Sequence, residues 1–184
     1  MDSYALLNLC KNKITKVAHF IVNPHASKLA LLVLAKRVPS IKVYLFDHRE
    51  FLRTVKEDLR RVGLEEATCL ACKRAMVLKA SEYGIPIMGD SLGQVASQTL
   101  HNMSFISKGI KIIKPLIGSD KEDVEPYVDE VLAKHVGAMG CPFKPDVVLT
   151  RPKRPLEIEF IVRKRIRHVK FLGVWSAREI AELG

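Results

Sequence analysis

Residues Met88–Leu100 read Met-Gly-Asp-Ser-Leu-Gly-Gln-Val-Ala-Ser-Gln-Thr-Leu, and the fold prediction begins from this stretch. The apolar segment 85–88 predicts a short buried strand, and Asp90 or Ser91 is suited to cap a helix over 91–106. A strand, a glycine turn and a helix N-terminus together present free backbone N–H groups and the positive end of a helix dipole. The stretch therefore predicts an anion site.

Polar side chains continue past this turn, at Ser97, Gln98 and Thr99. They could line the anion site. They equally fit a simpler interpretation, in which they cap and solvate the first turns of the helix.

Strands and helices alternate on both sides of the stretch. Apolar runs predict strands at 16–22, 41–46, 85–88, 110–117, 147–148 and 156–162. Helical spacing of apolar residues predicts helices at 26–37, 50–62, 69–83, 91–106, 119–135 and 177–183. This order is typical of an α/β domain with a Rossmann-like, mostly parallel sheet and helices on both faces. Ligands of such sheets bind beyond the carboxyl ends of the strands.

The composition is that of an ordinary globular protein. Of 184 residues, 48% are hydrophobic and 27% are charged, which argues against disorder or a coiled coil. No apolar run reaches the roughly 18 residues of a membrane span, and the N-terminus does not resemble a signal peptide. We therefore expect a cytoplasmic protein without membrane contacts. The low content of Asn and Gln leans toward a thermophilic source.

Basic residues are concentrated near the C-terminus. The net charge is +10, and 151–170 holds eight basic residues against two acidic ones. A composition shift near Pro145 suggests an α/β domain over 1–145 and a basic extension over 146–184 packed on it. The extension is either a solvated basic face or a contact for nucleic-acid phosphates. The candidate contacts are Arg151, Lys153, Arg154, Arg163, Lys164, Arg165 and Arg167.

Four motifs in order point to one family. Gly-Asp-Ser-Leu-Gly-Gln-Val-Ala-Ser-Gln-Thr-Leu at 89–100 closely resembles the signature of the 4-thiouridine synthetase family, the PP-loop sulfurtransferases of tRNA thiolation and thiazole biosynthesis. Cys-Lys-Arg-Ala-Met at 72–76, Lys-Pro-Leu-Ile-Gly-Ser-Asp-Lys at 114–121 and Val-Gly-Ala at 136–138 resemble its other elements. The resemblance is firm over 69–138 and loose over 17–50.

The resemblance implies a reaction and a fold. In this family ATP adenylates a tRNA uridine and sulfur then replaces AMP, on an adenine nucleotide α-hydrolase-like sheet. ATP with Mg²⁺ and tRNA are thus the implied ligands. By the same resemblance the nucleotide-binding residues are Ile21, Val22, Asn23, His25, Ser27, Leu45, Phe46, Lys73, Gly89, Asp90, Gln94 and Gln98, with Lys73 standing where Arg is usual.

The loop after the first strand departs from the family pattern. The family has Ser-Gly-Gly-x-Asp-Ser there, whereas this chain has Asn-Pro-His-Ala-Ser-Lys at 23–28. Both glycines are missing, and Pro24 has no N–H to donate to a pyrophosphate. We therefore expect a degenerate pyrophosphate loop.

Two further departures concern length. Only about 20 residues separate Phe46 from Cys69, where the family has room for another βα unit. We also expect no counterpart here of the upstream domains that hold tRNA in the family. We expect a separate tRNA-binding subunit, or the basic extension, to replace them, unless the chain no longer handles tRNA.

Three cysteines form a candidate catalytic set. Cys69 and Cys72 are a CxxC pair that shares one helix face. Related tRNA thiolases pair such a motif with a third cysteine, here Cys141, to hold an iron–sulfur cluster. Zinc, with Cys10 or a histidine as a further ligand, is an alternative, as are a redox pair that forms a disulfide or persulfide and simple buried thiols. Cys10 is expected to pack among leucines.

Two functional hypotheses follow from these observations. The first is a sulfurtransferase that acts on tRNA uridine, as an enzyme or as a subunit of a split enzyme. The second is a non-catalytic paralogue that binds a nucleotide or RNA. A scaffold without ligands is a third, weaker alternative.

Overall fold

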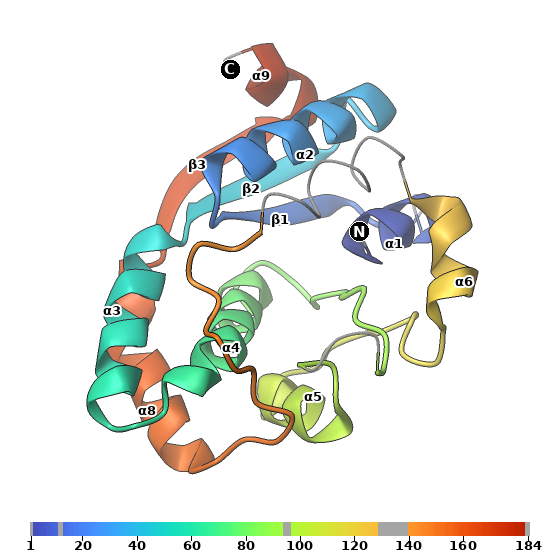
Figure 1. Cartoon of the computed structure of the whole chain (residues 1–184). Helices are drawn as coiled ribbons and strands as arrows, with labels where there is room; N and C mark the ends of the chain where they lie inside the picture. The colour runs from blue at the N-terminus through green and yellow to red at the C-terminus, as the bar shows by residue number, and fades with distance from the viewer. Residues whose placement is uncertain (1, 11–12, 94–96, 129–139, 183–184) are drawn as a thin grey trace.

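A mixed β-sheet lies at the centre of the computed structural model, which describes residues 2–10, 13–93, 97–128 and 140–182 (Figure 1). Within these residues the strands follow the order β1 (Lys16–Ile21), β2 (Lys42–Asp47) and β3 (Lys170–Ser176). β1 and β2 are parallel, whereas β3 is antiparallel to β2. With helices on both faces of a sheet that contains a parallel pair, the predicted α/β class is confirmed.

The two faces of the sheet are covered by different helices. Figure 1 shows α2 (Pro24–Arg37) and α9 (Ala177–Glu182) above the strands, where they pack on each other. On the other side, α3 (Arg49–Arg61), α4 (Thr68–Ser81) and α8 (Pro155–Arg165) pack together. No helix in the described ranges is long and apolar enough to cross a membrane.

The main core lies between the sheet and the second group of helices. Phe20 of β1 stacks on Phe46 of β2 with 4.7 Å between ring centroids, because these two positions are in register on one face. Val55 of α3, Ala75 of α4 and Val162 of α8 belong to the same cluster of buried residues. Each of the three helices therefore buries an apolar stripe against one shared core.

Shorter elements complete the fold. They are α1 (Asp2–Cys10), η1 (Glu65–Ala67), α5 (Leu100–Ser107), α6 (Lys121–Val124), η2 (Glu125–Tyr127) and η3 (Ile166–His168). Sequence analysis missed α1, which buries Ala5 and Leu6 against Leu116 and Val124. Cys10 packs against this cluster, as expected.

Several predicted elements are confirmed. The strands at 16–22 and 41–46 and the helices at 26–37, 50–62, 69–83 and 177–183 are present, with ends that shift by a few residues. The strand predicted at 156–162 is wrong, because this segment is helix α8. Pro155 starts the helix, and Ile158, Ile161 and Val162 are buried at helical spacing.

Other predicted elements are shorter than expected or absent. The strands at 85–88 and 110–117 reduce to one parallel bridge between Ile87 and Ile113, since the chain turns at 114–119. Residues 147–148 lie in no strand. Of the helix at 119–135, α6 and η2 are present, with Asp120 as the cap, and 129–135 lie outside the described residues.

The helix predicted from residue 91 begins at Leu100 instead. Two backbone N–H groups of the preceding turn bond outside a helix, Leu92 N to Ile117 O at 3.1 Å and Gly93 N to Gln98 O at 2.9 Å. Gly93 adopts φ +76°, a conformation that suits glycine. The cap is therefore Thr99, whose side chain accepts from Asn102 N.

Candidate functional site

Three buried side chains in and beside the loop of the signature stretch each have an oxygen without a hydrogen-bond partner. Asp90, Ser91 and Asn102 are buried. Among the described residues, Asp90 Oδ2, Ser91 Oγ and Asn102 Oδ1 have no hydrogen-bond partner. Buried polar atoms in folded proteins are usually paired, so three such oxygens within residues 90–102 make this segment a candidate ligand site.

Asn102 also holds the loop in shape. Its Nδ2 donates to Leu149 O at 2.7 Å and to Ser97 O at 3.2 Å. Gly89 and Gln98, two of the predicted nucleotide contacts, are buried in the same segment. Gln94 lies outside the described residues.

Two lysines lie near Asp90. Lys73, on α4, places its Nζ 2.6 Å from Asp90 Oδ1. Lys114 lies near both groups: burial lowers its pKa, the Asp90 carboxylate opposes this shift, and the Lys73 charge adds to it. Two cations around one carboxylate leave a net positive charge, which suits an anionic ligand.

Sequence analysis assigned no role to Lys114. The sequence shows that Lys114 begins the 114–121 motif. Its closeness to Asp90, however, depends on the bridge that joins Ile87 to Ile113. That contact places the chain before Lys114 beside the chain before Asp90, and local sequence carries no signal for it.

In the loop after β1, one side chain accepts hydrogen bonds from the backbone N–H groups that follow it. Asn23 Oδ1 caps α2 by accepting from His25 N at 3.1 Å and Ala26 N at 3.4 Å. His25 points to solvent, and Ser27 is buried. The backbone N–H groups of His25 and Ala26 are therefore already bonded within the chain, and the degenerate pyrophosphate loop stays a prediction.

The residues predicted at the strand ends separate onto two faces. Ile21 and Leu45 line a mostly apolar cavity of about 350 Å³ together with Ser27 and residues of α2, β3 and α9. Val22 and Phe46 belong to the main core on the opposite face. The structure does not bring these four positions to one surface, because successive side chains of a strand point to opposite faces.

The three cysteines of the candidate set lie near one another. Burial raises the pKa of both Cys69 and Cys72, and the neighbouring Cys141 thiol raises both further. Cys141 is exposed. Its neighbour Gly140 accepts a 3.5 Å hydrogen bond from Asn23 Nδ2, which links this segment to the loop after β1.

The cysteine set was tested for its fit to a metal centre. No group of three or more His, Cys, Asp or Glu side chains within 2–10, 13–93, 97–128 and 140–182 is placed to hold a metal ion. An iron–sulfur cluster or a zinc ion at these cysteines therefore stays a prediction.

The matches to known proteins agree with this geometry. The family model of the thiamine biosynthesis protein (ThiI) matches residues 12–155. The chain belongs to this family. The resemblance seen in the four motifs is thereby confirmed.

Two relatives of this ThiI-family chain are named probable tRNA sulfurtransferase. The protein of Methanocaldococcus jannaschii is 33% identical over 143 residues, which cover 72% of this chain and 37% of that protein. The protein of Thermococcus kodakarensis is 41% identical over 119 residues, which cover 60% and 29%. The chain thus spans about a third of the length of these relatives.

A solved structure of similar fold is described as a 4-thiouridine synthetase–RNA complex with bound ATP. Its TM-score is 0.59 at 19% identity, and the match covers 87% of this chain and 48% of that one. At this identity the likeness supports the fold that the ThiI match implies.

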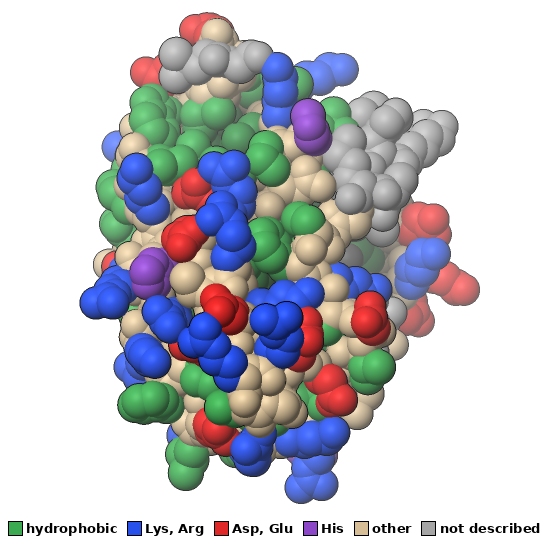
Figure 2. Space-filling model, turned by 60° about the vertical axis from the view of Figure 1, so that its left-hand side comes forward, with side chains coloured by type: hydrophobic (Ala, Val, Ile, Leu, Met, Phe, Trp, Pro, Cys, Tyr) green, Lys and Arg blue, Asp and Glu red, His purple; other side chains and the backbone are tan. Residues whose placement is uncertain are grey.

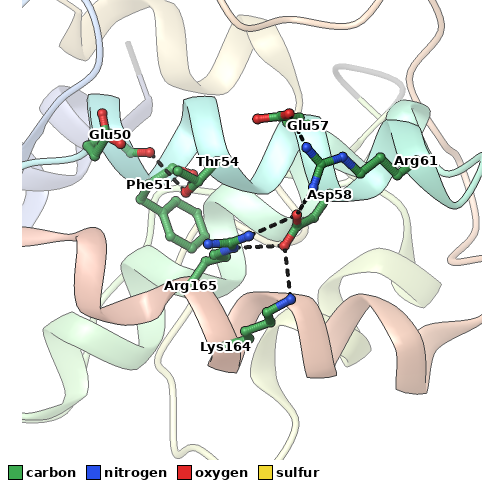
Figure 3. A network of polar contacts seen from close by, with 8 residues as sticks. All are labelled: Glu50, Phe51, Thr54, Glu57, Asp58, Arg61, Lys164 and Arg165. Atoms are coloured by element: carbon green, nitrogen blue, oxygen red, sulfur yellow. Dashed lines mark hydrogen bonds and ion pairs between the residues drawn. The ribbon is translucent and has the colours of Figure 1, made fainter.

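The basic extension lies largely beyond the ThiI match and is tied to α3 (Figure 3). Arg165 donates to Asp58 at 2.7 and 2.9 Å, and Lys164 lies 3.7 Å from the same carboxylate. The Arg165 hydrogen bond lowers the pKa of Asp58. These contacts hold α8 against α3.

Other predicted nucleic-acid contacts are also paired within the chain. Arg163 bonds Glu159 at 2.7 Å, Lys153 bonds Glu66 at 3.2 Å, and Arg154 pairs with Glu157. Figure 2 shows Lys and Arg interspersed with Asp and Glu over this side of the molecule. Arg151 and Arg167 are exposed. The extension is therefore less cationic than its sequence suggests.

Proposed function

We propose that this ThiI-family chain is an ATP-dependent sulfurtransferase that acts on tRNA uridine, with the nucleotide at the signature loop. One observation supports this most. Lys73 and Lys114 surround Asp90, next to the buried oxygens of Asp90, Ser91 and Asn102 that lack partners. The names of the relatives and of the solved structure support the choice of ATP and tRNA.

The proposed chemistry has two steps. The uracil oxygen attacks the α-phosphorus of ATP and pyrophosphate leaves; sulfur then replaces the adenylated oxygen and AMP leaves. Lys73 and Lys114 would stabilise the negative charge on the phosphates. Asp90 Oδ2 is an oxygen ligand of the kind that Mg²⁺ prefers.

We assign the transfer of sulfur to the cysteines. Cys141 is exposed and would receive sulfur from a donor outside the chain. The outer sulfur of a persulfide donor would pass to the Cys141 thiolate, and the donor would leave as a thiol. The resulting Cys141 persulfide would displace AMP from the adenylated uridine. The thiolate of Cys69 or Cys72 would then release the thiouridine by forming a disulfide with Cys141, which an external thiol would reduce. This role needs no metal.

We further propose that tRNA is held together with a separate RNA-binding subunit. The pairing of Arg163, Lys164 and Arg165 with acidic side chains supports this, because these cations already have partners. In this proposal Arg151 and Arg167 remain contacts for phosphates. A tRNA substrate also implies a cytoplasmic location.

One observation favours the second hypothesis, a paralogue that binds a nucleotide but does not adenylate RNA. The cap formed by Asn23 occupies the N–H groups of the loop after β1. Calorimetric titration with ATP and with AMP, each with and without Mg²⁺, separates the two. Binding of ATP together with thiolation of tRNA supports the enzyme; binding of AMP alone supports the paralogue.

Ser91→Ala tests the site directly. Removing a buried hydroxyl without a partner should leave the melting temperature unchanged or raise it, while the affinity for ATP falls about tenfold because the ligand loses a hydrogen bond. Ser107→Ala is the matched control, since Ser107 Oγ already bonds Met103 O at 2.7 Å. An unchanged affinity in Ser91→Ala would place the nucleotide elsewhere.

A further inference from the structure

Three aromatic rings gather on the open part of the sheet face. Tyr44 of β2, Tyr83 just after α4 and Phe171 of β3 lie with ring centroids 4.7, 5.7 and 6.4 Å apart. Phe171 is 43% exposed, and both tyrosines are partly exposed. We call these three residues the aromatic platform.

The surroundings of the aromatic platform are apolar and accessible. Val174 and Ala18 stand in register with Tyr44 on the neighbouring strands, and both are exposed. Tyr44 and Tyr83 pack against the main core and remain partly exposed. Exposed aromatic and apolar side chains gathered in one place mark an interaction surface.

Positive charge flanks the aromatic platform. Lys16 Nζ lies 5.5 Å from the centroid of the Tyr44 ring, and exposed Lys42 is in register with Lys16 on the next strand. Like charges directly opposite each other on a sheet are unfavourable. Of the acidic side chains nearby, Glu82 is paired with Lys79 at 3.0 Å and Asp47 with Arg49 at 2.6 Å.

We propose that the aromatic platform, with Lys16 and Lys42, binds unpaired bases of single-stranded RNA. Rings that stack on bases beside lysines that contact phosphates are the usual way to bind a single strand without sequence preference. The choice of RNA over another anionic aromatic ligand rests on the proposed function. Phe171 and Val174 lie beyond residues 12–155 of the family match, whereas Tyr44, Tyr83, Lys16 and Lys42 lie within it.

The position of the platform suits an RNA that also reaches the signature loop. Tyr83 follows the end of α4 at Ser81, whereas Lys73 lies near the middle of this helix. Ten residues of helix span about 15 Å, which two or three nucleotides of extended RNA can cover. Bases next to a target uridine can therefore rest on the platform.

The test is fluorescence anisotropy with a short labelled oligouridine and with a labelled RNA duplex, at low salt. Phe171→Ala should weaken binding of oligouridine by at least about fivefold, since stacking contributes about 1–3 kcal/mol per base. Phe171→Tyr should bind like the parent chain. Leu172→Ala is the matched control, because Leu172 is 37% exposed on the same strand but outside the ring cluster.

A second variant covers the case in which Phe171→Ala unfolds. Lys16→Ala combined with Lys42→Ala changes only exposed side chains, and it should lower the slope of log affinity against log salt by about 0.7 per lost phosphate contact. Equal loss in Leu172→Ala and Phe171→Ala, or duplex bound as tightly as oligouridine, would overturn the proposal. So would self-association of the parent chain that Phe171→Ala abolishes.

Titration with ATP separates this inference from the proposed function. Phe171→Ala should bind ATP like the parent chain, because the platform lies away from Asp90. If oligouridine binding survives Phe171→Ala while ATP and tRNA thiolation behave as proposed, only the platform is wrong. If ATP does not bind the parent chain, the nucleotide proposal fails whatever the anisotropy shows.

Discussion

Two loops of this chain lead into a helix, and they differ in whether their polar groups are hydrogen-bonded within the chain. The loop after β1 uses Asn23 Oδ1 to bond the N–H groups of His25 and Ala26. The signature loop leaves Asp90 Oδ2 and Ser91 Oγ buried without partners. The capped N–H groups of the first loop are already hydrogen-bonded. Buried polar atoms without partners, as in the second loop, gain free energy when a ligand bonds to them. This difference supports our proposal that the ligand binds at the signature loop.

The variant with the largest expected effect tests whether sulfur transfer and nucleotide binding depend on different residues. Cys141→Ala should abolish transfer of sulfur to tRNA and leave ATP affinity unchanged, because Cys141 adjoins the loop after β1 and not the signature loop. A thiolation assay and calorimetry measure the two. Cys10→Ala, in the packed α1, is the control. Loss of both properties in Cys141→Ala would contradict this separation of roles.

The two asparagines should differ in what they contribute to stability. Asn102→Ala should lower the free energy of unfolding by about 2–3 kcal/mol, because buried carbonyls of Leu149 and Ser97 lose their donor. Asn23→Ala removes a helix cap and should cost about 1 kcal/mol. Denaturant titration of both variants measures the difference. Equal losses would mean that the signature loop is no more buried than the cap.

Lys114→Ala tests which loop binds the phosphates. Losing one charge-assisted hydrogen bond should weaken ATP binding about tenfold, for a contribution of about 1.5 kcal/mol. Lys111→Ala changes an exposed lysine of the same segment and should have little effect. Calorimetry at fixed salt decides. The comparison of the loops fails if the two variants bind ATP equally well.

The smallest effect is a dependence of ATP binding on pH. Burial lowers the pKa of Lys114, so this lysine loses its proton at a lower pH than an ordinary lysine. Affinity for ATP should therefore fall as pH rises through that lowered pKa. Lys114→Arg keeps its charge and should flatten the profile. A profile with the same slope in both proteins would show that Lys114 does not bind the phosphates.

Most of the fold around β1 and β2 could be read from apolar periodicity. The runs at 16–22 and 41–46 are strands, and the helical spacing at 50–62 is α3. Periodicity misled at 156–162, where a short apolar run fits a strand and a helix equally well. Pro155 at the first helical position was the available signal.

Only part of the candidate site could be predicted from local sequence patterns. The motif at 89–100 located the signature loop, and strand alternation alone could have warned that Ile21 and Val22 face opposite sides. Lys114, in contrast, reaches Asp90 through contacts between segments far apart in the chain.

Local sequence was sufficient for the family, the α/β class and the strongly basic charge, because motifs, periodicity and composition are properties of neighbouring residues. Which polar atoms stay unpaired, which cations of the basic extension meet Asp58 and Glu159, and which rings meet on the sheet depended on packing. These outcomes are set by distances between residues remote in sequence, since burial and electrostatic pairing act through space and not along the chain.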